Sequence, residues 1–389
     1  MNDPLSILKG LVTKDTSTPN GANAALDQLA TQLLERGLNV ARYEFLRKSD
    51  SEGVKIKSIY VSESSDYKPK VLIIGHIDTV SKSDDWTRPP LVFTQEKTKE
   101  GDRAYGLGIY DMKAGLATMI HAAQTIKNRN VAYLIVTDEE SGGFYGAGKI
   151  VKELSHLPDF VISPEPSNFK IEVLQKGFLN FKLHFAGRSA HSARPWQGIN
   201  ALEVMNDFIM SVKQDKIFER KNKWCFSTTF AQTVSECQNK RENQLPDKCA
   251  SVVNIRYISE TPPAEIRRVL SSHAKAIRNK YRIILEGETY APKILIRQFG
   301  RSPHGTLVDC REDHPYVTLL SNLLARRDIA PELSASEGTS DVRFFADQGI
   351  QGICFGPPGS GNHRPDEYII LNGFKKYVEV FQDFVGSIK

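Results

Sequence analysis

Four short apolar runs constrain the fold of this chain more than any other feature of its sequence. They are VLIIG (71–75), AYLIV (132–136), DFVIS (159–163) and GICFG (352–356). Each run is continuous rather than alternating, which is typical of strands that are buried on both faces of a sheet. Helical patterns lie between the runs, as in DMKAGLATMIHAAQTIK (111–127), and helices are also expected at 4–12 and 22–36. Strands that alternate with helices predict an α/β domain with a mixed, largely parallel sheet flanked by helices.

The middle of the chain follows a different pattern, in which apolar and polar residues alternate. FLNFKLHFAG (178–187) and SVVNIRYIS (251–259) have the period of two that half-exposed antiparallel strands show. Helical patterns near 198–213 and 263–280 accompany them. The α/β pattern then resumes with HPYVTLLSNLLARR. We therefore predict a two-layer α+β insert that divides one larger domain into two segments, with the boundaries 1–177, 178–290 and 291–389.

Composition excludes several classes of protein. The 389 residues carry a formal charge of +5, spread in short basic groups without interleaved aromatic residues, which argues against a nucleic-acid surface. No apolar stretch reaches the length of a membrane span and no signal peptide is visible, so we expect no membrane partner and a cytoplasmic location. The five cysteines are odd in number and contain no CxxC pair, so we expect idle or buried thiols in a reducing compartment.

Histidine and acidic residues follow the apolar runs, and one more acid opens the helical pattern after the turn YGLGIY. In chain order these residues are His76, Asp78, Asp111, Glu139, Glu140, Glu165 and His363. Ligands of open α/β sheets bind outside the carboxyl ends of the strands, so we expect these side chains to meet at one edge. A single histidine or acid in such a place is more often a packed or solvated residue. The recurrence in four places carries the prediction.

The residue types at this edge suit zinc or a similar divalent ion. Two histidines and at least five carboxylates exceed the needs of one ion. Two ions about 3.5–4 Å apart, which share a carboxylate and a water, would use them. The charge also balances, because two dications are neutralised by Asp111, Glu140, Glu165 and a hydroxide. We therefore predict two Zn²⁺ per subunit, for which Co²⁺ or Mn²⁺ could substitute.

Two adjacent glutamates, Glu139 and Glu140, end the second apolar run. Successive side chains at a strand end point in different directions, so Glu140 can reach the ions while Glu139 faces the cavity beside them. This predicts Glu139 as the general base that takes a proton from the attacking water and later delivers it to the leaving nitrogen. Asp78, two residues after His76, is placed to hold the other imidazole nitrogen. By itself, a pair of glutamates would more often be a solvated helix start.

Seven motifs of the chain resemble those of the co-catalytic zinc amidohydrolases, which include acetylornithine deacetylase, succinyl-diaminopimelate desuccinylase, aminoacylase and glutamate carboxypeptidase. The motifs are GHIDTV, GLGIYDMKAG, TDEESGG, SPEP, GRSAHSARPWQGINA, GTSD and NHRPDEY. The resemblance implies that Asp111 bridges the two ions, with His76 and Glu165 on one and Glu140 and His363 on the other. It also implies that the insert is a lid or dimerisation domain and that the protein is a homodimer.

The resemblance further implies residues that contact the substrate. His191, in GRSAHSARPWQG, matches a histidine that reaches the partner's active site and stabilises the oxyanion of the tetrahedral intermediate. By itself it would be a structural loop histidine. Arg256 matches a residue that holds the substrate α-carboxylate, although a surface arginine on a strand is the alternative. The other matches are Asn243, Gly338, Thr339, Ser340 and, more weakly, Lys176.

These predictions together indicate a zinc-dependent hydrolase for the amide bond of an N-acyl amino acid or a short acyl-peptide with a free α-carboxylate. Glu165, where some members have aspartate, resembles the deacylase and carboxypeptidase branches. GTSD resembles the desuccinylase branch and NHRPDEY the acetylornithine deacetylase branch, so the acyl group stays open. The alternatives are a dipeptidase or aminopeptidase of the same family, which reads a free amine, and a metal-binding protein without activity.

Overall fold

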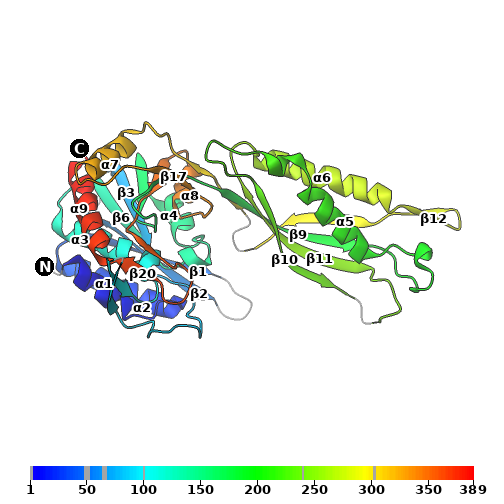
Figure 1. The fold of residues 1–389 in the computed structure, drawn as a ribbon, viewed down its shortest axis with the longest axis horizontal. Helices are drawn as coiled ribbons and strands as arrows, with labels where there is room; N and C mark the ends of the chain where they lie inside the picture. Colours follow the sequence, from blue (N-terminus) through cyan, green and yellow to red (C-terminus); the bar gives the residue numbers. More distant parts are fainter. Residues whose placement is uncertain (1–2, 48–52, 64–67, 100, 239–240, 301–303) are drawn as a thin grey trace. The chain divides into compact units, whose positions relative to one another are not determined.

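The protein divides into two compact units in a computed structural model that describes residues 3–47, 53–63, 68–99, 101–238, 241–300 and 304–389. The first unit consists of Met1–Gln175 and Val308–Lys389, and the second of Lys176–Leu307. Figure 1 draws the second unit mainly in green and yellow, whereas the first unit carries the colours of both chain ends.

A mixed sheet runs through the first unit, and its strand order within the described residues is β1-β2-β6-β3-β7-β18-β8-β16, with β17 beside β8. Its strands are β1 (Asn39–Arg47), β2 (Val54–Ser62), β3 (Val71–His76), β6 (Val131–Val136), β7 (Phe160–Ser163), β8 (Ile171–Gln175), β16 (Val308–Asp309), β17 (Leu333–Ser336) and β18 (Gln351–Cys354). The four apolar runs form β3, β6, β7 and β18, which are neighbours and parallel to one another. Their residues are almost all buried, as continuous apolar strands require. The predicted α/β class is therefore confirmed.

Helices cover both faces of this sheet (Figure 1). They are α1 (Pro4–Val12), α2 (Pro19–Glu35), α3 (Ala114–Thr125), α4 (Ala147–Glu153), α7 (Pro315–Ala325), α8 (Val342–Ala346) and α9 (Leu371–Ser387). On one face, Leu72 and Ile74 of β3 pack in a core with Ile150 of α4 and Phe345 of α8. The other face lies against α3, which in turn packs against α9. Helix α2 begins three residues earlier than the sequence predicts, because Thr18 caps it with a proline at its first position.

A smaller sheet of the first unit has the strand order β19-β20-β5-β4. Its strands are β4 (Thr94–Thr98), β5 (Gly101–Tyr105), β19 (Gly359–Ser360) and β20 (Tyr368–Ile370). Arg88 lies over the ring of Tyr105, and Arg103 lies over the ring of Tyr368. The Asp366 carboxylate accepts hydrogen bonds from the backbone of Thr87 and Arg88, both at 3.2 Å. These contacts fix the connection between β19 and β20, on which His363 lies.

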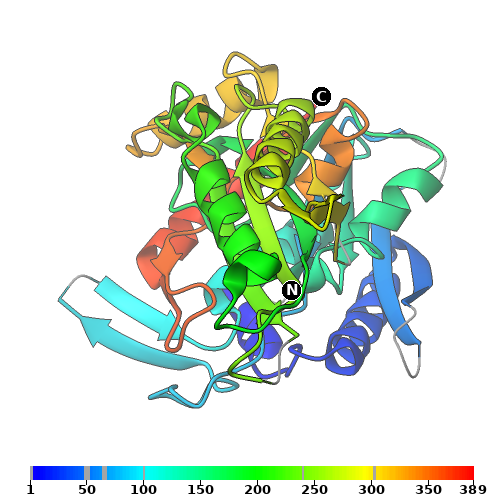
Figure 2. The same cartoon turned by 90° about the vertical axis from the view of Figure 1, so that its right-hand side faces the viewer.

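The second unit is an antiparallel sheet covered by two helices, and Figure 2 shows the helices side by side. Its strand order is β10-β11-β9-β14, with β15 also beside β9. The elements are β9 (Gly177–Ala186), α5 (Ala201–Lys213), β10 (Thr229–Cys237), β11 (Lys248–Tyr257), α6 (Pro263–Lys280), the hairpin β12 (Ile283–Leu285) and β13 (Glu288–Tyr290), β14 (Lys293–Gln298) and β15 (His304–Gly305). The inward residues of β9 and β11, such as Leu183 and Val253, share a core with Phe208 of α5 and Leu270 of α6.

The second unit ends later than the sequence predicts. The predicted insert stops at residue 290, but β14 pairs with β9 over six residues and β15 follows it on the same strand. KILIRQ alternates as an edge strand does, and only the pairing partner reveals the sheet to which it belongs. The chain leaves the first unit after Gln175 and returns at Val308, and these two residues are register partners in β8 and β16.

The cysteines do not all behave as the sequence predicts. Cys237 and Cys249 form a disulfide, whereas Cys225, Cys310 and Cys354 are thiols. The expectation of five thiols was wrong because β10 and β11 pair in a register that makes Cys237 and Cys249 direct cross-strand partners, with 4.1 Å between their Cα atoms. Among the described helices, none combines the length and the apolar character that a membrane crossing requires.

Candidate active site

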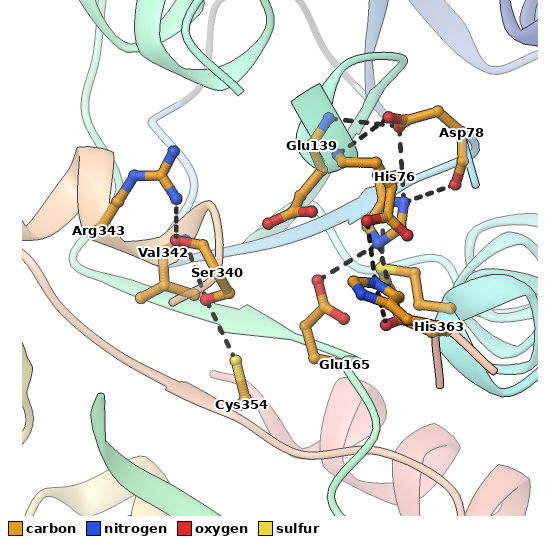
Figure 3. A network of polar contacts seen from close by, with 12 residues as sticks. His76, Asp78, Glu139, Glu165, Ser340, Val342, Arg343, Cys354 and His363 are labelled. Atoms are coloured by element: carbon orange, nitrogen blue, oxygen red, sulfur yellow. Dashed lines mark hydrogen bonds and ion pairs between the residues drawn. The ribbon is translucent and has the colours of Figure 1, made fainter. Parts of the chain in front are cut away.

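Five side chains with metal-binding chemistry meet in the first unit, and Figure 3 labels three of them, His76, Glu165 and His363. His76 is the last residue of β3, and Glu165 follows β7 by two residues. Glu140 lies in the short 3₁₀ turn η2 (Glu139–Ser141) that follows β6. Asp111 lies in η1 (Ile109–Lys113), one turn of π-helix before α3, and His363 lies between β19 and β20. The edge predicted from the sequence is therefore where the structure assembles these residues.

Asp111 lies between two clusters and contacts a histidine in each. Its Oδ1 is 3.4 Å from Nε2 of His76, and its Oδ2 is 3.3 Å from Nε2 of His363. Glu165 completes the first cluster, with Oε1 3.6 Å from Nε2 of His76. Glu140 completes the second, with Oε2 3.0 Å from Nε2 of His363. A carboxylate with one oxygen in each cluster has the arrangement of a bridging ligand.

The residues of both clusters fit a metal ion. Ligand atoms around one tetrahedral ion with bonds of about 2.0–2.1 Å are roughly 3.3 Å apart, which is close to the separations in both clusters. Nε2 of His76 and Oε1 of Glu140 are buried without a hydrogen-bond partner, so each holds a lone pair or proton that the protein itself leaves unused. His76, Asp111 and Glu140 each offer an atom within 4.8 Å of the others.

The carboxylates of the clusters lie close enough to one another to raise the pKa of a neighbour. Burial raises the pKa of Glu165 well above its usual value, and Asp111, Glu139 and Glu140 add to this effect. Hydrogen bonds to Asp111 and Glu140 raise the pKa of His363 to about 10. The positive charge of a metal ion beside these carboxylates would offset their mutual repulsion.

Asp78 lies beside the second imidazole nitrogen of His76, where the sequence places it, and its carboxylate has further contacts. Nδ1 of His76 lies 2.9 Å from the backbone oxygen of Asp78 and 3.5 Å from its carboxylate, so the backbone is the nearer partner. A carbonyl oxygen can only accept, which puts a proton on Nδ1 and turns Nε2 toward the clusters. The carboxylate of Asp78 instead accepts from the backbone nitrogens of Glu139 and Glu140, at 3.3 and 3.0 Å. Asp78 thus orients both His76 and the glutamate pair.

The turn that carries Glu139 and Glu140 is held by residues that the sequence does not single out. The carboxylate of Asp138 accepts from the backbone of Tyr145 and Gly146, at 3.0 and 2.9 Å. Arg343 donates to the carbonyl of Gly142 at 2.5 Å. Gly143 has φ of 62°, and a Cβ there would collide with the Asp341 carboxylate. Asp341 and Arg343 lie directly after GTS in the sequence. They are about 200 residues from this turn, and for that reason the sequence does not indicate the contact.

Glu367 is another residue that sequence reasoning missed. Its buried carboxylate accepts hydrogen bonds from the backbone nitrogens of Gly108, Tyr110 and Asp111, the latter two at 3.2 and 3.4 Å. Burial raises the pKa of Glu367 to about 8. Glu367 lies four residues after His363, so it connects the loop of one histidine to the turn that carries the shared aspartate. Its position after His363 in NHRPDEY was the available signal.

The predicted substrate contacts fall on both units. In the first unit, Ser340 is buried and donates from its backbone nitrogen and hydroxyl to Gln175, at 3.0 and 2.9 Å, while Gly338 is exposed and Thr339 partly buried. The second unit carries His191, Asn243, Arg256 and Lys176. Lys176 is buried, with its ammonium 5.1 Å from the centre of the Phe226 ring. Nε of Arg256 donates to the Asn254 side chain at 3.2 Å.

The fold and this geometry agree with a known family. The model of peptidase family M20/M25/M40 matches residues 72–387, from the start of β3 to the end of α9, and so includes both units. The chain belongs to this family. The M20 assignment confirms the resemblance noted in the motifs. It makes the protein a hydrolase of amide bonds.

Three proteins show how this M20 member relates to others. The succinyl-diaminopimelate desuccinylase of Orientia tsutsugamushi (strain Ikeda) is 27% identical, over 97% of this chain and 94% of its own length. A tripeptidase from Staphylococcus aureus superposes with a TM-score of 0.75 at 18% identity, covering 99% of this chain and 97% of its own. A metallo-carboxypeptidase of family M20 from Sulfolobus solfataricus gives 0.73 at 15% identity, covering 100% and 99%. The two solved structures share the fold of this chain.

Proposed function

We propose that this protein is a dinuclear zinc hydrolase that cleaves the amide bond of an N-acyl amino acid, or of a short acyl-peptide, with a free α-carboxylate. The observation that carries the proposal is the pair of carboxylate–imidazole clusters that share Asp111. One ion would bind the residues of only one cluster, whereas two ions would use the residues of both. His76, Asp111 and Glu165 would hold one ion, and Asp111, Glu140 and His363 the other.

The metal pair, when bound, supplies Lewis-acid activation of water and of the scissile carbonyl. Glu139 does the proton transfer: its carboxylate takes a proton from the attacking water and delivers it to the nitrogen of the leaving amine. Partial burial raises the pKa of Glu139 well above its usual value, against an opposing effect of His76 and with smaller contributions in the same direction from Asp341 and Glu140. Asp78 fixes the backbone from which Glu139 projects.

The second unit would supply the substrate contacts. Nδ1 of His191 accepts a hydrogen bond from the backbone nitrogen of Ala193 at 3.1 Å, which leaves the ring proton on Nε2. The Nε2–H group of His191 can donate a hydrogen bond to an oxyanion. We propose that it does so in the active site of the partner subunit of a homodimer. Arg256 would hold the α-carboxylate of the substrate, and Asn243 and Lys176 would be further substrate contacts of this unit. The first unit would contribute residues 338–340. The homodimer and the cytoplasmic location stay predictions.

A substrate panel tests the proposal. The zinc-loaded enzyme is assayed with N-succinyl-diaminopimelate, other N-succinyl and N-acetyl amino acids, and unblocked dipeptides and tripeptides. Among these substrates we expect the N-succinyl compounds to be cleaved best, because the Orientia relative is a succinyl-diaminopimelate desuccinylase. Removal of the metal with a chelator should abolish turnover, and added zinc should restore it.

Two outcomes of the panel would contradict the proposal in different ways. Cleavage of unblocked peptides, with no cleavage of acyl amino acids, would make the protein an aminopeptidase or dipeptidase of the same family. Stoichiometric zinc binding without turnover of any substrate would make it a metal-binding protein without activity.

A further inference from the structure

The loop between β10 and β11 is closed by a disulfide. Cys237 is the last residue of β10 and Cys249 is the second residue of β11, and the two lie directly opposite each other. Beside them, the backbone nitrogen of Gln238 donates to the carbonyl of Lys248 at 2.9 Å. Strand β10 is at the edge of the sheet, and Cys237 is partly exposed, so a small reductant can reach this sulfur.

The part of this loop that leads into β11, residues 243–247, pairs with the segment that carries His191. Several hydrogen bonds join the two segments, among them Ser192 nitrogen to Asn243 oxygen at 2.9 Å, Leu245 nitrogen to Ala190 oxygen at 2.9 Å, Ser189 hydroxyl to Leu245 oxygen at 2.9 Å, and Gly187 nitrogen to Asp247 oxygen at 2.8 Å. His191 itself is the bridge partner of Gln244. The residues on both sides of His191 are therefore tied to the loop that the disulfide closes.

The His191 side chain gains its position from this backbone pairing. The side chain is exposed, and the hydrogen bond described for its ring comes from Ala193, two residues along the same segment. The contact with Ala193 fixes the ring relative to its own segment, and the pairing with residues 243–245 fixes the segment relative to the unit. A looser loop would leave the ring orientation intact but let the whole segment move.

We propose that the Cys237–Cys249 disulfide is a thiol-sensitive clasp that positions His191, so that the catalytic rate follows the oxidation state of this cysteine pair. The proposal rests on the role proposed for His191 in oxyanion stabilisation. A cross-link at the base of a loop restricts the conformations of the loop, and its removal from an edge strand permits local opening without unfolding of the unit. The disulfide acts through His191 and is a positioning element.

The chemistry of the switch is balanced. A phosphine attacks one sulfur, the S–S bond breaks, and water supplies two protons to the cysteine thiols and one oxygen to the phosphine oxide. Oxidised glutathione reverses the change: the two cysteine thiols become the disulfide, and one glutathione disulfide becomes two thiols. A phosphine is the better probe, because dithiols bind zinc.

The experiment compares the Cys237→Ser/Cys249→Ser variant with wild type and with Cys225→Ser, a matched control that removes an exposed thiol outside the pair. In the clasp variant, kcat should fall about tenfold with KM nearly unchanged, because a misplaced oxyanion donor affects the transition state more than substrate binding. Hydrogen exchange should speed up about tenfold in peptides with the Ser192 and Leu245 amides and stay unchanged in α5. Phosphine-treated wild type should match the variant, and oxidised glutathione should restore it.

Several results would overturn the clasp. One is a wild-type kcat in both the variant and the reduced protein. Another is faster exchange at Ser192 with no change in kcat, which would separate the loop from catalysis. A third is free thiols at both positions in protein purified without reductant, found by alkylation and mass spectrometry. If the oxidised wild type turns over no substrate, the proposed function fails, while the exchange of the Ser192 amide still tests whether the disulfide holds the segment.

Discussion

Single residues of the site differ in what holds them, and this sets what each substitution does. The Asp78 carboxylate accepts hydrogen bonds from the backbone nitrogens of Glu139 and Glu140. The contacts described above for the two clusters do not include the Glu139 carboxylate. His76 and Glu165 contact each other directly. Replacement of a cluster residue should therefore change metal binding, and replacement of Glu139 should change proton transfer alone.

Glu139→Gln keeps the shape of the side chain and removes its basicity. We expect kcat to fall by about 10²–10⁴-fold, the range that a general acid–base group contributes, with zinc content unchanged. The measurement pairs steady-state kinetics with metal analysis of the dialysed protein. A wild-type rate would remove Glu139 from the mechanism, and a loss of zinc would make it a ligand.

Glu172 gives the protein a pH-dependent stability that is separate from the clusters. Burial raises the pKa of Glu172 to about 7, against opposing contributions from Gln175 and Lys170. The pKa is higher in the folded state than in the unfolded state, so the cost of the buried charge is absent below pH 4.5, grows as the pH rises toward 7, and is complete above it. The difference amounts to a free energy on the order of 3 kcal/mol.

Glu172→Gln should therefore raise the melting temperature relative to wild type at pH 8 and leave it nearly unchanged at pH 5. Thermal unfolding at both pH values, at a fixed zinc concentration, measures the effect. The control is Glu332→Gln, an exposed carboxylate that pairs with Lys170, the residue that also acts on Glu172. An equal shift at both pH values would show that the pKa of Glu172 is the same in the folded and unfolded states.

Sequence reasoning at this scale predicted residues from the chemistry of their side chains, and missed contacts that depend on the fold. His76, Asp111, Glu140, Glu165 and His363 were predicted because ligand chemistry limits the residue types and strand ends limit their places. The contact of the Asp78 carboxylate with the glutamate turn was not predicted. The backbone oxygen and the carboxylate of Asp78 can both accept from the His76 imidazole, and the sequence spacing does not show which of them is nearer.

At the level of elements, the site depends on how turns are joined to one another. Glu367, directly before β20, accepts hydrogen bonds from the backbone of η1. Asp366 beside it accepts a hydrogen bond from the segment before β4. The helices and parallel strands were predicted because their apolar periods are long enough to be distinctive. The turns were not, because their partners lie far away in the chain, as Arg343 and Gly142 do.

Glu367→Ala should weaken zinc binding by about ten- to hundredfold, since it leaves three backbone donors beside Asp111 unpaired and frees the loop of His363. Competition with a fluorescent zinc chelator measures the affinity directly. Glu379→Ala, on the exposed side of α9, is the control. Equal zinc affinity of wild type and Glu367→Ala would show that the two loops keep their places without this carboxylate.

At the level of the whole molecule, the residues of the candidate metal site all lie in the first unit, and the predicted substrate residues lie mainly in the second. The sequence predicted this division because the hydrophobic period changes from continuous to alternating at the first boundary. It placed the second boundary too early, because β14 and β15 are short and join their sheet only through β9.

Removal of residues 176–307, with a short glycine-containing turn between Gln175 and Val308, should therefore give a folded first unit. We expect it to bind zinc and to have no measurable turnover, since it lacks Arg256 and His191. Zinc analysis, a cooperative thermal transition and the substrate assay check the three parts of this expectation. A truncated chain that precipitates or binds no zinc would show that the first unit depends on the second.

The pairing of Gln175 with Val308 has a consequence for how such enzymes diversify. The inserted segment leaves β8 and returns in β16 at residues that are directly paired. For the sheet of the first unit it is therefore a long hairpin connection, whatever its size. Recombination at that one spot could exchange the entire second unit, with the substrate residues predicted on it, while the candidate metal site of the first unit keeps its sequence. New specificities could then arise in a single genetic step instead of by gradual change of a pocket.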